Sequence, residues 1–409
     1  MSFKKTKYTC YFTYLAMSSV FSLPPILFMT FREMYGISYT LLGTLVLVNF
    51  CTQLTVDLIF SFFSRYFNIK KTLRVMPLLT SAGLLIYALI PTFFPQIAYL
   101  GLLVGTVLFS IAAGLCEVLL SPTVAALPSE TPEKDMSMLH SLYAWGVLTV
   151  VVISTAYLQL FGRENWMFLT VFWALVPIIS SVLFCTSPLP EMDISHSNTK
   201  AAGKRQFGMA LCVACIFLGS AAENGMTNWI SAYVESALQI PKALGDILGL
   251  ALFAILLGTA RTLYAKYGKN ILNTLLFSML GTIVCYLVAG LSPVPVVSMV
   301  ACVLTGFCTS MLWPGTLILM EEKFPAAGVT AYALMAAGGD FGGSVAPQML
   351  GAIVDGVAAT SWARSFPGLT PDQVGMKVGM LIATIFPILG FCLLLYMKKY
   401  FKNSIKKRP

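Results

Sequence analysis

Charged residues are scarce in this chain of 409 residues. They make up 11% of it, against roughly a quarter in soluble domains, while 57% of the residues are hydrophobic. The sequence also contains no phosphate-binding loop, no HExxH zinc motif and no long soluble segment. These absences exclude ATP hydrolysis as an energy source and predict a protein of the membrane that is not an enzyme and needs no cofactor or metal.

Apolar windows of about 20 residues, the length that crosses a hydrocarbon core, occur twelve times. We therefore predict an all-α polytopic membrane protein with twelve transmembrane helices. The predicted spans are 8–31, 38–64, 74–94, 97–127, 137–161, 165–186, 207–234, 241–265, 271–291, 295–321, 326–356 and 374–399. The first is interpreted as a span and not as a signal peptide, because it is too long and lacks a small-residue cleavage site.

Basic residues indicate the orientation of the spans. With both termini in the cytoplasm, 20 of the 26 basic residues lie inside, as the positive-inside rule requires. The net charge of +9 then reflects topology and attraction to anionic lipid, with no support for nucleic-acid binding. We expect a multi-pass protein of the plasma membrane, and we expect it to be monomeric.

Two segments half a chain apart resemble each other. GLCEVLLSPT, from Gly114, and GFCTSMLWPGT, from Gly306, both read Gly-x-Cys with Pro eight residues after the Gly. This internal echo predicts two related bundles of six helices. We place them at residues 1–186 and 207–409, joined by a cytoplasmic linker at 187–206.

Ten cysteines lie in or beside apolar spans. Cys212 and Cys215 form a CxxC motif, but the surrounding sequence is helical and has no neighbouring histidine. We interpret them as small packing residues and expect neither redox chemistry nor a metal site.

Six plus six spans, a central linker and short basic turns at 63–73 and 264–272 resemble the Major Facilitator Superfamily of secondary transporters. Within it, the chain is most similar to the sugar-porter branch that includes the fucose:proton symporters. Glu117 followed by Pro122 in the fourth span, and the Gly-rich eleventh span from Ala331, carry this similarity. The resemblance implies the major facilitator fold and alternating access, with a substrate site between two bundles.

Four acidic side chains lie well inside predicted spans. They are Asp57, Glu117, Glu223 and Asp340, one from each of four helices. A carboxylate in hydrocarbon is costly and persists only with a partner, a proton or a polar interior, so we predict these four as proton-coupling residues. For each the alternative is a structural role, as a packing anchor, a hydrogen-bonded cluster or, for Asp57, a gate.

Other polar and aromatic residues lie beside these acids at helical spacing. The predicted substrate-binding residues are Asn49, Gln53, Glu117, His140, Trp145, Glu223, Asn224, Asn228 and Trp313. Amides can bind hydroxyl groups and tryptophans can stack on sugar faces, although packing remains open for His140 and the tryptophans. Arg65 and Arg261 are predicted to be gating residues.

The sequence thus predicts a secondary active transporter, with proton-coupled symport of a sugar or another small polar solute as its function. Two alternatives remain. One is a proton-coupled antiporter that exports a lipophilic or cationic compound, and the other is a non-transporting sensor built on a transporter fold. The predicted partners are therefore the solute, the coupling proton and the lipid bilayer.

Overall fold

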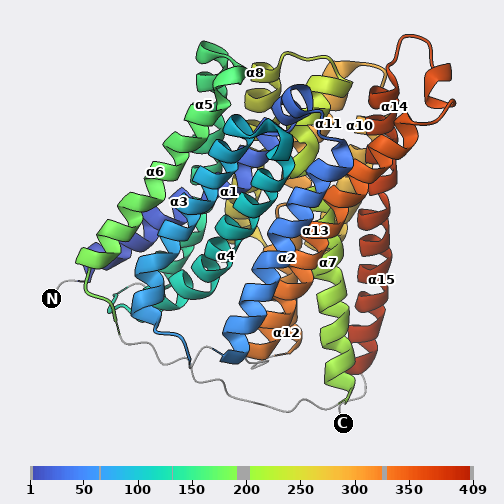
Figure 1. Ribbon diagram of the computed structural model, residues 1–409. Coiled ribbons are helices and arrows are strands. Elements are labelled where there is room, and N and C mark those ends of the chain that lie inside the picture. The colour runs from blue at the N-terminus through green and yellow to red at the C-terminus, as the bar shows by residue number, and fades with distance from the viewer. Residues whose placement is uncertain (1–2, 64–65, 131, 191–202, 325–328, 406–409) are drawn as a thin grey trace. The chain divides into compact units, whose positions relative to one another are not determined.

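The computed structural model describes residues 3–63, 66–130, 132–190, 203–324 and 329–405, and its regular elements are all helices (Figure 1). Among these residues, eleven helical stretches are long and apolar enough to cross a membrane. A further long helix, α13 (Val329–Ala358), has 30 residues and carries the Gly-rich sequence. The fold is that of an all-α polytopic membrane protein with twelve spans in two halves.

Two compact groups of residues divide the chain. The first contains Met1–Ile37 and Val48–Ser195, and the second contains Ser38–Leu47 and His196–Pro409. Helix α2 (Tyr39–Phe63) therefore contributes its first turns to the second group and the remainder to the first.

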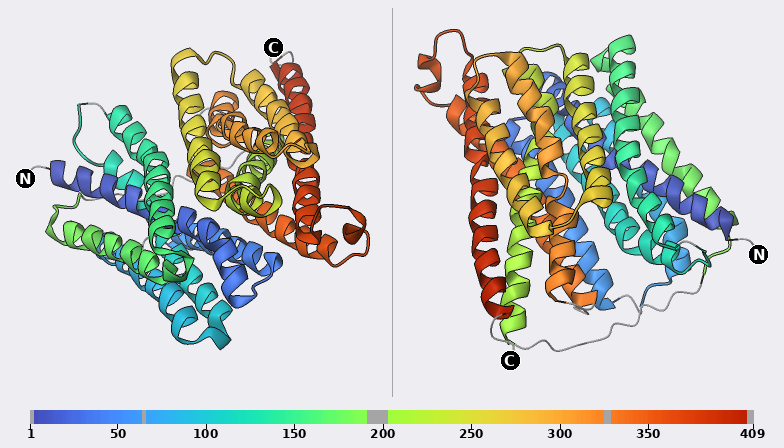
Figure 2. Two further views of the ribbon diagram at one scale, coloured as in Figure 1. Left: turned by 90° about the horizontal axis from the view of Figure 1, so that it is seen from above. Right: turned by 180° about the vertical axis from the view of Figure 1, so that it is seen from behind.

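The first group is a bundle of long helices (Figure 2). Besides α2 it consists of α1 (Lys4–Tyr35), α3 (Ile69–Phe93), η2 (Pro95–Ile97), α4 (Ala98–Ala125), α5 (Pro132–Phe161), η3 (Arg163–Asn165) and α6 (Trp166–Thr186). Helix α3 packs on both α4 and α6, and α1 packs on α5. Close approach of α3 and α4 depends on small residues, since Gly83 of α3 and Gly105 of α4 leave no room for a β-carbon against each other's backbone.

The second group has more interruptions. Its elements are α7 (Gly203–Ala232), η4 (Tyr233–Ala237), α8 (Lys242–Leu244), η5 (Gly245–Ala251), α9 (Leu252–Tyr267), α10 (Ile271–Leu291), α11 (Pro295–Thr309), α12 (Leu312–Lys323), α13, η6 (Ala363–Ser365), α14 (Pro371–Ala383) and α15 (Ile385–Ile405). Elements η4 and η5 are π-helical. Helices α11 and α12 form one span that is broken at Ser310 and Met311.

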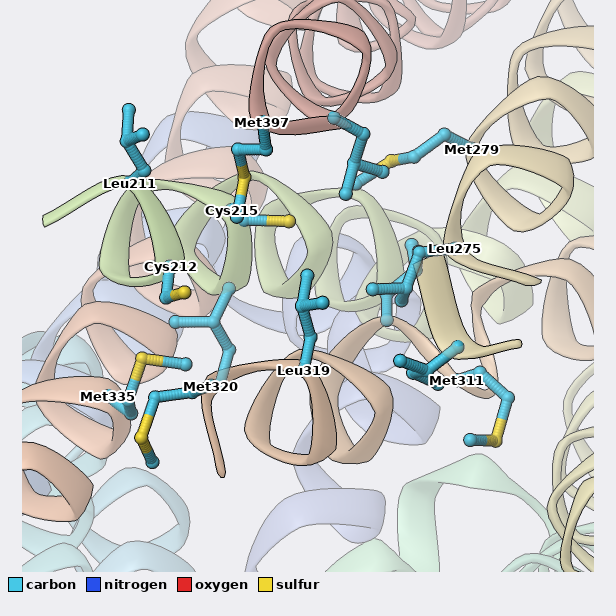
Figure 3. Packing of buried hydrophobic residues seen from close by; sticks show 14 of the residues in the cluster. Leu211, Cys212, Cys215, Leu275, Met279, Met311, Leu319, Met320, Met335 and Met397 are labelled. Atoms are coloured by element: carbon cyan, nitrogen blue, oxygen red, sulfur yellow. The ribbon is translucent and has the colours of Figure 1, made fainter. Parts of the chain in front are cut away.

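Helix α7 is central to the second group and packs on α13, α12 and α15. Its Cys212 and Cys215 are fully buried in an apolar cluster with Leu319 and Met320 of α12 and Met397 of α15 (Figure 3). The two thiols act there as small apolar side chains.

Candidate functional site

The Gly residues of the internal echo are positions of close helix contact. A β-carbon added to Gly114 of α4 would lie 3.2 Å from the carbonyl oxygen of Gln53 on α2. One added to Gly306 of α11 would lie 2.5 Å from the carbonyl oxygen of Phe253 on α9. The repeated motif therefore places the fourth span against the second, and the tenth against the eighth, in the same way.

The Pro residues of the echo explain a second shared feature. Proline has no N–H group and its ring crowds the carbonyl four residues earlier, so that carbonyl loses its partner within the helix. Pro122 has this effect on Val118, beside Glu117, and Pro314 has it on Ser310. Helix α4 remains continuous through Pro122, whereas the tenth span breaks at Ser310.

Glu117 lies on α4 and is half-buried. Its carboxylate forms no hydrogen bond or ion pair with any residue that the structure describes. Its neighbour Cys116 is buried and lines a small cavity with Thr13, Thr80 and Ser180 of the same group. An acid in such surroundings is neutralised most easily by a proton.

A hydrogen-bonded amide cluster lies on α2 beside α4. Gln53 donates from Nε2 to Asn49 Oδ1 at 2.8 Å, and Ser110 of α4 donates to the same oxygen at 2.7 Å. All three side chains are buried. The Asn49 oxygen is therefore satisfied, while no described residue accepts a hydrogen bond from Asn49 Nδ2 or donates one to Gln53 Oε1. Asp57 lies one turn further along the helix and is also buried.

In the second group, Arg261 of α9 and Glu223 of α7 come together. Arg261 donates from Nε to the Ser310 carbonyl at 2.9 Å, and its Nη2 lies 3.8 Å from Glu223 Oε1. The freed carbonyl at the helix break thus holds the guanidinium group beside the acid. Sequence reasoning predicted Arg261 as a gate and did not pair it with Glu223, because the contact joins residues far apart in the chain.

The polar residues near Glu223 bond mainly within α7. Asn224 donates from Nδ2 to Ser220, and Asn228 donates to the Asn224 carbonyl at 3.0 Å. Thr227 donates to the Glu223 carbonyl at 2.9 Å. The side-chain oxygens of both asparagines accept no hydrogen bond from the described residues.

Glycines of α13 allow other groups to approach closely. Gly339 contacts the Trp313 ring and Gly342 contacts the Phe217 carbonyl of α7, so neither position has room for a β-carbon. Asp340 between them is 4% exposed. The Trp313 ring thus packs directly on the backbone of α13 at Gly339, where a larger residue would not fit.

The remaining predicted site residues are not brought into these clusters. Trp145 on α5 is 61% exposed. His140 also lies on α5, but its side chain is outside the described part of the structure, as is the whole of Arg65. Their roles stay predictions.

A buried ion cluster, which the sequence analysis missed, lies at the π-helical turns. Lys242 Nζ lies 3.2 Å from Asp246 Oδ2 and 3.8 Å from Glu235 Oε2, and Ser231 donates to Asp246. Asp246 is fully buried. The sequence signal was the i, i+4 spacing of Lys242 and Asp246 at the start of an apolar run.

One ion pair outside the spans joins the ends of α1 and α5. Lys7 Nζ lies 3.0 Å from Asp135 Oδ1, and Ser129 donates to Asp135 Oδ2 at 2.7 Å. Hydrogen bonds from Ser129 and Lys7 lower the pKa of Asp135 below its ordinary value.

Residues 9–347 match the sequence pattern of the Major Facilitator Superfamily. The chain belongs to that superfamily. It is therefore a multi-pass membrane transporter of small molecules and not an enzyme. No curated protein sequence matches it.

Solved structures with the same fold include three transporters. A D-xylose-proton symporter has a TM-score of 0.73 at 14% identity, with 94% of this chain and 96% of that chain covered. A bacterial homolog of the human lysosomal transporter Spinster gives 0.73 at 12% identity, with 98% and 99% covered. The fucose:proton symporter of E. coli gives 0.58 at 12% identity, with 95% and 99% covered. These similarities establish the fold, and the expected likeness to sugar porters is confirmed at that level.

Proposed function

We propose that this superfamily member is a proton-coupled symporter of a sugar or another small polar solute. Both termini are placed in the cytoplasm on the basis of the positive-inside rule. The substrate class rests on the xylose and fucose symporters among the structural neighbours and on the polar side chains that line the spans.

One observation supports proton coupling more than any other. Glu117 lies in an apolar span with no hydrogen bond or ion pair to the described residues, in contrast to Glu223, which has Arg261 beside it. A carboxylate without a cation in a low-dielectric setting is stable when protonated and unstable when charged. Glu117 therefore carries the proton in this proposal, and the open amide atoms of Asn49 and Gln53 bind solute hydroxyls.

The test is solute accumulation in proteoliposomes under an inward proton gradient. One pH unit corresponds to about 1.4 kcal/mol, so coupling of one proton to one neutral solute drives accumulation of up to about tenfold. We expect Glu117→Gln to abolish accumulation while still exchanging labelled for unlabelled solute across the membrane. Glu33→Gln is the matched control, since Glu33 is an exposed acid of the same group that pairs with Arg163.

Two results would count against symport. Accumulation by Glu117→Gln equal to that of the wild type removes Glu117 from coupling. Efflux of a cationic or lipophilic compound driven by the proton gradient, with no sugar accumulated, indicates the antiporter.

A further inference from the structure

The guanidinium group of Arg261 lies on the inward side of its helix. Leu257 and Ala254, four and seven residues earlier on the same face, are each 9% exposed. Ile255 and Thr259 occupy the opposite, exposed face of α9. The Arg261 side chain is 36% exposed although it lies on the face of α9 that is otherwise buried.

The fold holds Arg261 in place without satisfying it. The Ser310 carbonyl, which Pro314 deprives of a helical partner, accepts from Nε. A guanidinium group has five N–H donors, and this bond uses one of them. The four others form no hydrogen bond with the described residues, because 3.8 Å to Glu223 is an ion-pair distance beyond hydrogen-bond range.

The hydrogen bonding of the Glu223 carboxylate is also incomplete. Its Oε2 is buried and accepts no hydrogen bond from the described residues. A bidentate pair between arginine and a carboxylate would bring both oxygens within about 2.9 Å of nitrogen atoms. In the structure, the two terminal NH₂ groups of Arg261 instead form no hydrogen bond with the described residues, and Glu223 balances the charge from 3.8 Å.

We propose that Arg261 binds the carboxylate of a small anionic solute, and that Glu223 takes up one proton as the solute carboxylate replaces it beside the guanidinium group. This inference rests on the proposed symport function and narrows its substrate to a solute with a carboxylate, such as a sugar acid. The charges of the Arg261–Glu223 pair balance: one solute anion and one proton, distinct from the proton on Glu117, enter a site that begins and ends with one cation and one anion.

Apart from Arg261, no charged group among the described residues forms an ion pair with Glu223. The ionisable groups on the elements packed against α7 include Asp340 on α13, Asp246 on η5, Glu235 on η4 and Cys308 on α11. Tyr286 of α10 donates to the Ala222 carbonyl of α7. The charged residues of α12 and α15 stand near the ends of those helices. Arg261 Nη2 lies 3.8 Å from Glu223 Oε1, so exchange between these two groups needs no third charge.

Binding is tested on the purified full-length protein by thermal stabilisation with matched pairs of probes. D-galacturonate is compared with D-galactose, and D-gluconate with D-sorbitol, so that each pair differs mainly in a carboxylate. We expect at least one acid to stabilise the wild type at concentrations where its neutral partner does not. Arg261→Gln should weaken that acid about a hundredfold, and Arg261→Lys about tenfold, because lysine keeps the charge but loses the bidentate edge.

The Glu223→Gln variant tests whether Glu223 takes up a proton when the solute binds or has only a structural role. In the wild type, affinity for the acid should rise as pH falls, because protonated Glu223 no longer competes for Arg261. In Glu223→Gln that pH dependence should be absent and the affinity high throughout. Arg163→Gln, which removes an exposed guanidinium group of the other half, should behave as the wild type.

Failure of this inference and failure of symport give different results. If no acid stabilises the protein more than its neutral partner, or if Arg261→Gln binds the acid as the wild type does, the carboxylate site is wrong. Proton-driven accumulation of galactose would then still support symport. Conversely, Arg261-dependent binding of an acid without proton-driven uptake of any probe would support the site and overturn symport.

Discussion

Gly306→Ala offers the sharpest test of the helix contact that positions Arg261. The added β-carbon would lie 2.5 Å from the Phe253 carbonyl oxygen, whereas ordinary contacts begin near 3.4 Å. The obstacle is backbone and not a flexible side chain. Helices α9 and α11 must therefore separate by about 0.9 Å to accept the methyl group.

The size of the effect follows from that displacement. Overpacking of this kind costs about 1–3 kcal/mol, and the better helix propensity of alanine returns up to about 1 kcal/mol. A 0.9 Å shift also stretches the 2.9 Å bond from Arg261 to Ser310 beyond hydrogen-bond range. Loss of a hydrogen bond to a charged group adds about 1.5–3 kcal/mol, so we expect a net destabilisation between about 1.5 and about 6 kcal/mol.

Thermal unfolding of the detergent-purified protein measures this change. Gly258→Ala is the matched control, because Gly258 lies on α9 itself and has nothing within 4 Å of the position of a β-carbon. The control should be as stable as the wild type or slightly more stable, while Gly306→Ala unfolds several degrees lower. Equal stability of the two variants would refute the reasoning, since it would mean that α9 and α11 do not touch at Gly306.

Two further predictions concern buried and interfacial charges. Lys242→Met should destabilise the protein by about 3–5 kcal/mol, because Asp246 and Glu235 lose the cation of Lys242. Adding Asp246→Leu to this variant should restore part of the lost stability in the same unfolding assay. Asp135 stabilises the fold fully above the ordinary carboxyl pKa of about 3.9, and this contribution is lost as pH falls through its lowered pKa in the folded state. Asp135→Asn should therefore flatten the acid side of the stability profile, and an unchanged profile would show that the Lys7 pair contributes nothing.

Much of the fold was predictable because each membrane span requires about 20 mostly apolar residues, which the sequence shows directly. The predicted span 271–291 is helix α10 with the same bounds, and the described ends of the other spans agree to within a few residues. The predicted start of the eleventh span, at 326–328, lies outside the described residues. The predicted span 295–321 is correct in extent, but the break at Ser310 was not predicted. Pro314 was its signal, and the same residue spacing leaves α4 unbroken at Pro122, so the local sequence alone does not decide the outcome.

The site was less predictable for a physical reason. Hydropathy shows that Glu117 and Glu223 are in apolar spans, but it does not show what faces them. The approach of Arg261 to Glu223 depends on how α9, α11 and α7 pack, which is a property of three distant segments. The amide cluster of Asn49 and Gln53 was visible as i, i+4 spacing, whereas its link to Ser110 of α4 was not.

The π-helical turns η4 and η5 have a consequence for the ancestry of the chain. A π-turn holds one residue more than an α-helix between the same two ends and is readily explained as a single-residue insertion. A homologue without that residue would keep a continuous eighth span but present a different side chain to Lys242, and a sequence alignment should open a one-residue gap within Gly245–Ala251. Loss of one residue there would turn the following part of the helix by about 100° and so change which side chains face the bundle.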